Sequence, residues 1–328
     1  MMPQDISKSP VCNLAAGEEI RGKWNQLIYR IRRRLGYGAT GAVYLADSIN
    51  GTVALKIGHD QMSITSEVNV LKRFSKVQGK VLGPSLIDVD DWQIRSVTYP
   101  FYAMEYLKGE TLFDFMRPKS PEWAGILLVQ LLTDLHMLHQ AGWAFGDLKP
   151  DNLLVTGPPY RIRWIDVGGT TVMDRSIKEY TEFFDRGYWG KGSRKAEPSY
   201  DLFSAGMVMV NLAYPARFTK KSDPDRQMQE LRKNSPMLRL YAHILEKAWN
   251  GKYRYAEEMR NELVLLLNEK DKRTVQQNKN PAVQKKAAVQ KQTRQSQKKK
   301  QKSFIAETFL VFTFVFVVYL FYMLGQTM

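Results

Sequence analysis

The most informative stretch of the chain is residues 145–152, which read Phe145-Gly146-Asp147-Leu148-Lys149-Pro150-Asp151-Asn152. Asp147 could orient a hydroxyl group, Lys149 could contact a phosphate, and Asn152 could hold Mg²⁺. A carboxylate, an amine and a carboxamide placed this closely together are the groups that phosphoryl transfer requires. The stretch therefore predicts a phosphotransfer site, provided that the other motifs of such a site occur elsewhere in the chain at suitable spacings.

A glycine-rich segment upstream predicts where phosphates would bind. Residues 35–44 read Leu35-Gly36-Tyr37-Gly38-Ala39-Thr40-Gly41-Ala42-Val43-Tyr44, a pattern of strand, tight turn and strand. The glycines lack a Cβ, so the backbone can approach phosphate oxygens closely. An ordinary hairpin turn would show the same pattern. The next predicted strand, residues 53–56, ends in Lys56, fifteen residues after Gly41, and this interval favours a nucleotide site.

The following segment predicts a helix that carries a partner for Lys56. Apolar residues recur at helical spacing in residues 63–74, at Ile64, Val68, Leu71 and Phe74. Glu67 falls on another face of this helix, and we expect it to pair with Lys56. Because only eleven residues separate the two, the connecting loop must be short. An exposed surface glutamate is the alternative interpretation.

Two further motifs complete the series. Residues 162–168, Ile-Arg-Trp-Ile-Asp-Val-Gly, predict a short apolar strand that ends in Asp166, a second carboxylate for Mg²⁺. Residues 201–206, Asp-Leu-Phe-Ser-Ala-Gly, predict the start of a large helix. In this order, the motifs resemble those of the eukaryotic-like (Hanks-type) bacterial Ser/Thr protein kinases, and the resemblance covers residues 21–268.

The resemblance implies an α+β, protein-kinase-like two-lobed fold, with a β-rich N-lobe over residues 21–105 and a helical C-lobe over residues 106–268. It implies ATP and Mg²⁺ as cofactors, with Asn152 and Asp166 holding the metal. Asp147 and Lys149 would be the catalytic pair, acting on the attacking hydroxyl and the γ-phosphate. The implied cofactor-binding residues are Leu35, Gly36, Gly38, Gly41, Val43, Ala54, Lys56, Glu67, Glu105 and Leu107, with Met104 as gatekeeper and the backbone of Glu105 and Leu107 holding adenine.

The chain departs from the family pattern at several positions. Phe145-Gly146 replaces the usual His-Arg, and Val167 replaces the Phe of Asp-Phe-Gly. Without that Arg, a phosphate in the segment after Asp166 lacks its usual partner. The hydroxyls in question are those of Thr170, Thr171, Ser176 and Thr181, and Lys178 and Arg186 are the alternative bases. Ala196-Glu197-Pro198 predicts a loop ahead of the helix, and Tyr188-Trp189-Gly190 takes the place expected for the substrate-cradling segment.

Composition adds broad limits. The chain has 328 residues, of which 44% are hydrophobic, enough for one two-lobed domain with a sizeable core. A single cysteine, Cys12, excludes an internal disulfide framework. No sequence cluster of His and Cys suggests a metal site, and we expect His136 and His139 to be structural. Residues 1–20 show no pattern of a cleavable signal peptide and predict an N-terminal tail.

The C-terminal part differs sharply from the rest. Residues 270–302 contain twelve Lys or Arg and one Asp, a net charge of +11, and no aromatic residue. This composition predicts a basic disordered linker over residues 269–302. Residues 308–328 then carry no charge and are mostly apolar. About twenty such residues span a bilayer as a helix, so residues 303–328 predict a C-terminal transmembrane anchor. Residues 298–302, on the N-terminal side of the predicted span, are rich in lysine. Basic residues beside a span favour the cytoplasmic side, so we expect the span to lie in the cell membrane with the kinase domain in the cytoplasm.

The layout of kinase domain, basic linker and terminal span is similar to that of sporulation-associated membrane kinases of Bacillus, which implies a role in spore development. The linker could bind double-stranded DNA through its phosphates, bind anionic lipid, or serve as a spacer. Kinases gathered on one polyanion could self-associate and phosphorylate one another. Arg30, Arg32, Arg33 and Arg34 on the first predicted strand would form either a basic stripe or a solvated strand face.

The sequence thus predicts an active enzyme that phosphorylates Ser or Thr in protein substrates. Two alternatives remain open. One is a pseudokinase scaffold at the membrane, which Phe145, Gly146 and Val167 keep under consideration. The other is a small-molecule or lipid kinase, because Gly-Asp at positions 146–147 also occurs in kinases of the aminoglycoside type. Lys149 argues against that second alternative.

Overall fold

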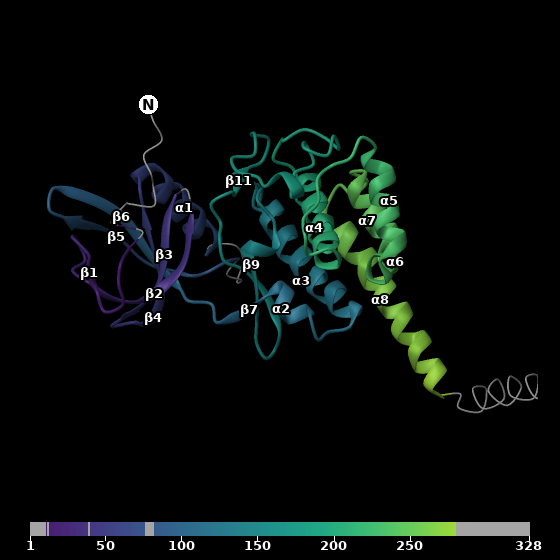
Figure 1. The fold of residues 1–328 in the computed structure, drawn as a ribbon, viewed down its shortest axis with the longest axis horizontal. Helices are drawn as coiled ribbons and strands as arrows, with labels where there is room; N and C mark the ends of the chain where they lie inside the picture. The colour runs from purple at the N-terminus through teal and green to yellow at the C-terminus, as the bar shows by residue number, and fades with distance from the viewer. Residues whose placement is uncertain (1–10, 12, 39, 76–81, 280–328) are drawn as a thin grey trace, which may run out of the picture. The chain divides into compact units, whose positions relative to one another are not determined.

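A computed structural model describes residues 11, 13–38, 40–75 and 82–279 of the chain. The strands of the N-lobe lie apart from the helices of the C-lobe (Figure 1). Six antiparallel strands form the N-lobe sheet, in the order β1-β2-β3-β4-β6-β5. Their bounds are β1 Glu19–Arg21, β2 Ile28–Gly38, β3 Gly41–Ser48, β4 Gly51–Gly58, β5 Leu86–Ile94 and β6 Val97–Glu105.

Strand β4 separates the two apolar clusters of the N-lobe. Val53, Leu55 and Ile57 belong to a cluster on one face of the sheet. Ala54 belongs to the cluster on the other face, which continues into the C-lobe. Because successive side chains of a strand point to opposite faces, Lys56 lies on the same face as Ala54. The alternation along β4 therefore directs the Lys56 amine toward the interior between the lobes.

Helix α1, Gln61–Phe74, follows β4 after only two residues. Asp60 caps its N-terminus by accepting a hydrogen bond of 2.8 Å from the backbone N–H of Ser63. Its buried face includes Ile64, Val68, Leu71 and Phe74, at the spacing predicted from the sequence. Glu67 is buried as well, so the alternative of an exposed surface glutamate is wrong.

The C-lobe consists mainly of helices with two small sheets. The sheets have the strand orders β10-β9-β7 and β11-β8. Their strands are β7 Gly109–Thr111, β8 Trp143–Ala144, β9 Leu153–Thr156, β10 Arg161–Trp164 and β11 Thr171–Val172. The helices are α2 Leu112–Met116, α3 Pro121–Gln140, α4 Pro198–Ala213, α5 Pro224–Asn234, α6 Pro236–Leu240, α7 Ala242–Trp249 and α8 Ala256–Lys279, with 3-10 turns η3 Pro150–Asn152 and η4 Glu182–Phe184.

The sequence-based domain bounds need two corrections. Residues 1–20 were expected to be a tail, but Ile20 lies in β1 and is fully buried, as is Val11. The Tyr44 hydroxyl donates a hydrogen bond of 2.7 Å to the Val11 carbonyl. Residues 269–302 were expected to be disordered from their start, but α8 continues to Lys279. Residues 269–279 contain neither Gly nor Pro, and extending a helix that has already formed costs little.

The remaining C-terminal predictions lie outside the described residues. These are the linker from residue 280 onward and the predicted anchor, residues 303–328. Cys12 also lies outside them. Within the described part of the chain, no helix is both long enough and apolar enough to cross a bilayer.

The arginines at positions 30–34 lie on β2, the second strand rather than the first. Arg30 pairs with Glu19 at 2.9 Å and Arg32 pairs with Asp47 at 2.5 Å, and all four side chains are exposed. Two of the three alternate members of the predicted basic stripe, Arg30 and Arg32, are therefore compensated by carboxylates. This arrangement favours the alternative of a solvated strand face.

Candidate active site

Lys56 and Glu67 form a buried ion pair. The Lys56 Nζ lies 2.7 Å from Oε1 and 2.6 Å from Oε2 of Glu67. The Tyr102 hydroxyl donates a second hydrogen bond of 2.7 Å to Glu67 Oε2. Burial first, and the Glu67 charge next, raise the pKa of Tyr102 well above its usual value, so the hydroxyl stays a donor. Both oxygens of Glu67 are thus engaged, and α1 fixes the position of the Lys56 amine.

The glycine-rich turn has open space beside two of its three glycines. Gly38 of β2 is paired with Gly41 of β3, which confirms the predicted strand–turn–strand. A Cβ at Gly36 or Gly38 would meet no atom within 4 Å. A Cβ at Gly41 would lie 2.1 Å from the carbonyl oxygen of Ile57, so only glycine lets β3 approach β4 here. Leu35 and Val43 are half-buried against the main core, and Ala54 belongs to it.

The predicted hinge begins in the last residues of β6. Met104 is buried beside Ala54 in the main core, and Leu107 is also buried. The backbone N–H of Glu105 donates to the Ser85 carbonyl at 2.8 Å. The Glu105 side chain accepts from Arg163 Nη2 at 3.1 Å. The backbone N–H of Glu105 is therefore already used, and its carbonyl oxygen is the group that could accept a hydrogen bond from adenine.

A buried aspartate on α4 holds the start of the catalytic loop, residues 145–152. Asp201 Oδ2 accepts from the Phe145 N–H at 2.7 Å, and Oδ1 accepts from the Gly146 N–H at 2.9 Å. His139 Nε2 lies 2.8 Å from the same Oδ2, so this histidine is structural, as expected. Asp201 is fully buried. These hydrogen bonds join residues more than fifty positions apart in the sequence and fix the backbone that precedes Asp147.

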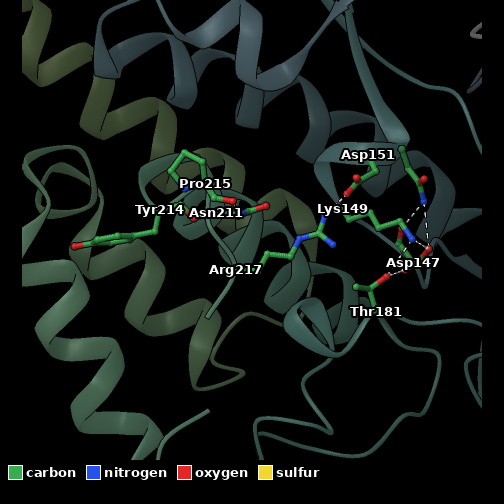
Figure 2. A network of polar contacts seen from close by, with 9 residues as sticks. Asp147, Lys149, Asp151, Thr181, Asn211, Tyr214, Pro215 and Arg217 are labelled. Atoms are coloured by element: carbon green, nitrogen blue, oxygen red, sulfur yellow. Dashed lines mark hydrogen bonds and ion pairs between the residues drawn. The ribbon is translucent and has the colours of Figure 1, made fainter. Parts of the chain in front are cut away.

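Asp147, Lys149 and Thr181 form one hydrogen-bonded group (Figure 2). The Lys149 Nζ lies 2.5 Å from Asp147 Oδ2 and 3.0 Å from Thr181 Oγ1. The Thr181 hydroxyl lies 3.0 Å from Asp147 Oδ1. Asn152 Nδ2 donates to the Asp147 carbonyl at 2.8 Å, so its amide oxygen faces away from that bond. Sequence reasoning treated Thr181 only as a phosphorylation candidate and missed this contact.

Asp166 begins the activation segment, defined here as residues 166–197. Its Oδ1 accepts from the Gly168 N–H at 2.9 Å. Gly168 also lies close to Glu67, because an added Cβ would be 3.4 Å from Glu67 Oε1. Among the described residues, no cluster of three or more His, Cys, Asp or Glu could hold a metal. The oxygens of Asp166 and Asn152 are hard ligands of the type that Mg²⁺ prefers, so these residues fit that ion with its phosphates and waters.

Two of the three residues that depart from the family pattern, Phe145 and Val167, pack into the core. Val167 is buried in the main core cluster, together with Phe145. The Phe145 ring packs on Trp164 with centroids 4.9 Å apart, and Trp164 packs on Phe74 of α1 at 5.8 Å. Phe145 therefore connects the catalytic loop with α1 through Trp164. A hydrophobic side chain therefore fills the packing position at residue 167 although Val replaces Phe there.

The activation segment is held by its own charges. Asp185, fully buried, accepts from Arg194 Nε at 2.8 Å and from the Tyr200 hydroxyl at 3.0 Å. Arg186 Nη2 pairs with Glu197 at 2.6 Å. Glu197 is the N-cap residue of α4 and Pro198 begins that helix. The expectation of a loop over residues 196–198 is therefore wrong at Pro198, because proline suits the first helical position.

The hydroxyl groups singled out from the sequence differ greatly in accessibility. Thr170 and Thr171 are completely buried, and Ser176 is exposed. Of the two alternative bases, Arg186 is already paired with Glu197. Lys178 Nζ contacts Ser66 Oγ of α1 at 3.2 Å. Trp189 is buried and donates to the Phe183 carbonyl at 2.9 Å, so the segment around it packs into the C-lobe.

A further glutamate near the site was not recognised from the sequence. The Glu179 side chain is exposed by its accessible area, but partial desolvation raises its pKa, and the charges of Asp166, Glu67 and Asp147 raise it further, while Lys56 opposes them. Glu179 therefore adds negative charge to the side of the site where Mg²⁺ would lie. Its contribution depends on the folded course of the activation segment, so no local motif could have indicated it.

Comparison with known proteins agrees with this geometry. A sequence model of the protein kinase domain matches residues 29–278. The serine/threonine-protein kinase YabT of Bacillus subtilis is 50% identical over 309 residues, which cover 94% of this chain and 89% of that protein. Human calcium/calmodulin-dependent protein kinase type 1B is 29% identical over 223 residues, 62% of each chain.

A third relative matches a shorter region. The serine/threonine-protein kinase pkn2 of Myxococcus xanthus is 32% identical over 133 residues, 39% of this chain and 16% of that protein. The expected resemblance to Hanks-type bacterial kinases is confirmed, and the fold is the kinase fold. Since the domain match covers most of the chain and the YabT match nearly all of it, the chain belongs to the protein kinase family, as a serine/threonine-protein kinase.

Proposed function

We propose that the chain transfers the γ-phosphoryl group of ATP to protein hydroxyls, with Asp147 orienting the attacking Ser or Thr. The observation that carries this proposal is the hydrogen-bonded group of Asp147, Lys149 and Thr181. An oxygen of the Asp147 carboxylate would accept a hydrogen bond from the incoming hydroxyl. The Lys149 ammonium, 2.5 Å from it, supplies positive charge for the transferring phosphoryl group.

The nucleotide side of the site fits the same reaction. Lys56, fixed by Glu67, would bind the α- and β-phosphates, and the open space at Gly36 and Gly38 admits phosphate oxygens. Asn152 and Asp166 would hold Mg²⁺, which neutralises phosphate charge when bound. These contacts act mainly by positioning and by electrostatic stabilisation, which is what phosphoryl transfer requires of a protein.

The test is phosphate incorporation by single-residue variants. Lys56→Ala and Asp147→Asn should each reduce autophosphorylation on Ser and Thr by orders of magnitude, because each removes a transition-state contact. Lys72→Ala on α1 and Asp174→Asn in the activation segment remove the same charges from exposed positions and serve as controls. Equal incorporation by the wild type and Asp147→Asn would contradict the assignment.

The alternatives fit the site less well. A pseudokinase scaffold needs no intact Lys56–Glu67 pair, yet that pair is buried and fully bonded. A small-molecule kinase needs no Lys149, whereas here Lys149 contacts both Asp147 and the activation segment. Both observations support protein phosphorylation.

The C-terminal predictions extend the proposal to location. Residues 303–328 would anchor the kinase in the cell membrane as a single span, with the kinase domain in the cytoplasm. Deleting these residues should release the protein from the membrane fraction while phosphotransfer is retained. A truncated form that still sediments with membranes after a salt wash would contradict the anchor. A role in spore development stays a prediction from family resemblance.

The charge of residues 270–302 extends the proposal to regulation. We expect double-stranded DNA to gather several kinases through its phosphates and so to speed phosphorylation of one copy by another. Stimulation should not depend on DNA sequence, should fall between low and moderate salt, and should decline at excess DNA. Replacing the Lys and Arg of this region by Gln should abolish it without changing the basal rate.

The competing interpretations of the linker give different results in the same assay. Binding to lipid alone predicts activation by vesicles that contain anionic lipid and no effect of DNA. A spacer predicts no response to either polyanion. Using the form that lacks residues 303–328 separates these effects from membrane insertion.

A further inference from the structure

Arg217 reaches from the loop after α4 to the catalytic loop (Figure 2). Its Nη2 forms an ion pair with Asp151 Oδ2. Its guanidinium carbon also lies 5.1 Å from the centre of the Phe184 ring. Asp151 follows Lys149 by two residues, and Phe184 follows Thr181 by three. Arg217 therefore touches the two segments that carry the hydrogen-bonded group around Asp147.

The residues before and after Arg217 are held in place by the C-lobe. Asn211 is completely buried, and its Nδ2 donates to the carbonyls of Tyr214 at 3.1 Å and Pro215 at 3.3 Å. The Tyr214 hydroxyl donates to the Leu231 carbonyl at 3.0 Å. These bonds fix the loop ahead of Arg217.

On the other side, Phe218 packs edge-on against Phe183, with ring centroids 5.0 Å apart, and against Trp189 at 6.1 Å. Phe183 is part of the activation segment beside Thr181. Since both flanks are anchored, the position of Arg217 is set by the fold and not by its ion pair alone.

The pair changes the charge that a substrate would meet. The Asp151 side chain is 56% exposed, so without a partner it would present a carboxylate beside the catalytic loop. Arg217 compensates that charge and is itself 39% exposed. Within the described residues, the Arg217 guanidinium makes no hydrogen bond other than the one to Asp151. A planar guanidinium with unused N–H groups matches a carboxylate or a phosphate.

We propose that Arg217 is a specificity-determining residue that selects substrates with an acidic side chain close to the phosphorylated Ser or Thr. The inference rests on the proposed function, because it requires the acceptor hydroxyl to lie at Asp147. A substrate segment placed there passes the exposed guanidinium, which attracts a carboxylate and repels a cation. Asp151, already paired, offers little attraction to a basic residue.

The test uses two peptides that share one serine and differ only in whether Asp or Arg residues flank it. The full-length wild type should show the higher kcat/KM with the acidic peptide. In Arg217→Ala, the exposed Asp151 carboxylate replaces the cation, so the ratio of acidic to basic kcat/KM should fall about tenfold. The change should lie mainly in the KM for peptide, with the KM for ATP unchanged.

Two further variants separate recognition from structure. Asp151→Asn keeps Arg217 and removes its partner, so it should increase the preference for the acidic peptide. Arg217→Lys keeps the charge and should retain that preference in weaker form, because lysine lacks the planar fork. Arg226→Ala removes an arginine whose ion pair with Glu230 is exposed on α5, and it should leave the ratio unchanged.

The outcomes are distinct. Opposite shifts of the ratio in Arg217→Ala and Asp151→Asn would support the proposal. A wild type that prefers the basic peptide would overturn it, and so would an equal loss with both peptides in Arg217→Ala, even with an unchanged melting temperature. If the wild type transfers phosphate neither to the peptides nor to itself, the proposed function fails and the inference fails with it.

Discussion

The Arg186 guanidinium and the Glu197 carboxylate lie 2.6 Å apart at the C-terminal end of the activation segment. Arg186 also donates to the Ser193 carbonyl at 2.6 Å and to Ser199 Oγ at 2.7 Å. The segment is thus ordered by charges that the chain itself supplies. Gly146 occupies the position where the family has a phosphate-binding Arg. The ordering of the activation segment therefore does not need a phosphate group bound at that position.

The first prediction concerns dependence on phosphorylation. Treating the kinase with a protein phosphatase, or replacing the exposed Ser176 by Ala, should leave transfer to a generic protein substrate within about twofold of the starting rate, as for other surface changes. The measurement is phosphate incorporation after the phosphatase has been removed. A hundredfold loss would show that a phosphate in the segment has a basic partner after all.

The second prediction concerns the Arg186–Glu197 pair itself. Arg186→Met leaves a partly buried carboxylate unpaired and should lower the free energy of unfolding by about 1–3 kcal/mol. Adding Glu197→Gln should recover part of the loss, which a double-mutant cycle measures. Without recovery in the double variant, the loss would belong to the other contacts of Arg186.

This second prediction has a pH dependence. Partial burial opposes the shift, but hydrogen bonds from Arg186 and Ser199 lower the pKa of Glu197 below its ordinary value of 4.5. A carboxylate whose pKa is lower in the folded state stabilises the fold at pH values above its pKa in the unfolded state. This stabilisation is lost as the pH falls through its pKa in the folded state. The difference between the wild type and Arg186→Met should therefore narrow below about pH 4.5.

The third prediction concerns Thr181, a positioning residue. Thr181→Val keeps the shape and removes the hydroxyl that contacts Asp147 and Lys149. Because hydrogen bonds to charged groups are strong, kcat should fall about ten- to a hundredfold. Thr181→Ser should stay close to the wild type, and the KM for ATP should be unchanged in both. A Val variant with wild-type kcat would show that the hydroxyl does not position Asp147.

The fourth prediction concerns Gly146, which has φ +86°. A Cβ here would lie 2.6 Å from the carbonyl oxygen of Gly169, so the family's Arg cannot simply be restored. Gly146→Ala should destabilise the protein by more than the cost of the left-handed backbone alone, which is about 1–2 kcal/mol. Gly190→Ala is the matched control, because Gly190 has φ +70° and no neighbour within 4 Å. If Gly146→Ala and Gly190→Ala had the same melting temperature, the Gly169 backbone must move aside to make room for the added Cβ.

The contrast between local and distant contacts explains what sequence could predict. Asp147, Lys149 and Asn152 lie within six residues, and the short loop between Lys56 and Glu67 left little choice of partner, so both groups could be predicted. Thr181 contacts Asp147 across 34 positions, and Arg217 contacts Asp151 across 66. Such pairs depend on the course of the whole C-lobe. At the N-terminus, β1 has three residues, too few to show a periodicity.

The ends of the catalytic domain were misplaced for a related reason. Composition predicted disorder from residue 269, because Lys and Gln dominate the sequence there. Helix propagation depends on the helix already formed and not on composition alone, so α8 reaches Lys279.

The last prediction concerns Glu179. Partial desolvation and the nearby charges of Asp166, Glu67 and Asp147 raise its pKa above the ordinary value of 4.5, although the side chain is exposed and solvent screens these charges in part. Ionised Glu179 therefore destabilises the fold at neutral pH, and this effect is absent below the unfolded pKa, where both states are protonated. Glu179→Gln should raise the melting temperature at pH 7, and the gain should disappear toward pH 4.

The same substitution removes negative charge near Asp166, so activity should require a higher Mg²⁺ concentration. Glu182→Gln removes the same charge from an equally exposed glutamate three residues later and is the control. A Glu179→Gln variant with unchanged Mg²⁺ requirement and unchanged melting temperature at pH 7 would show that Glu179 does not act on the metal side of the site.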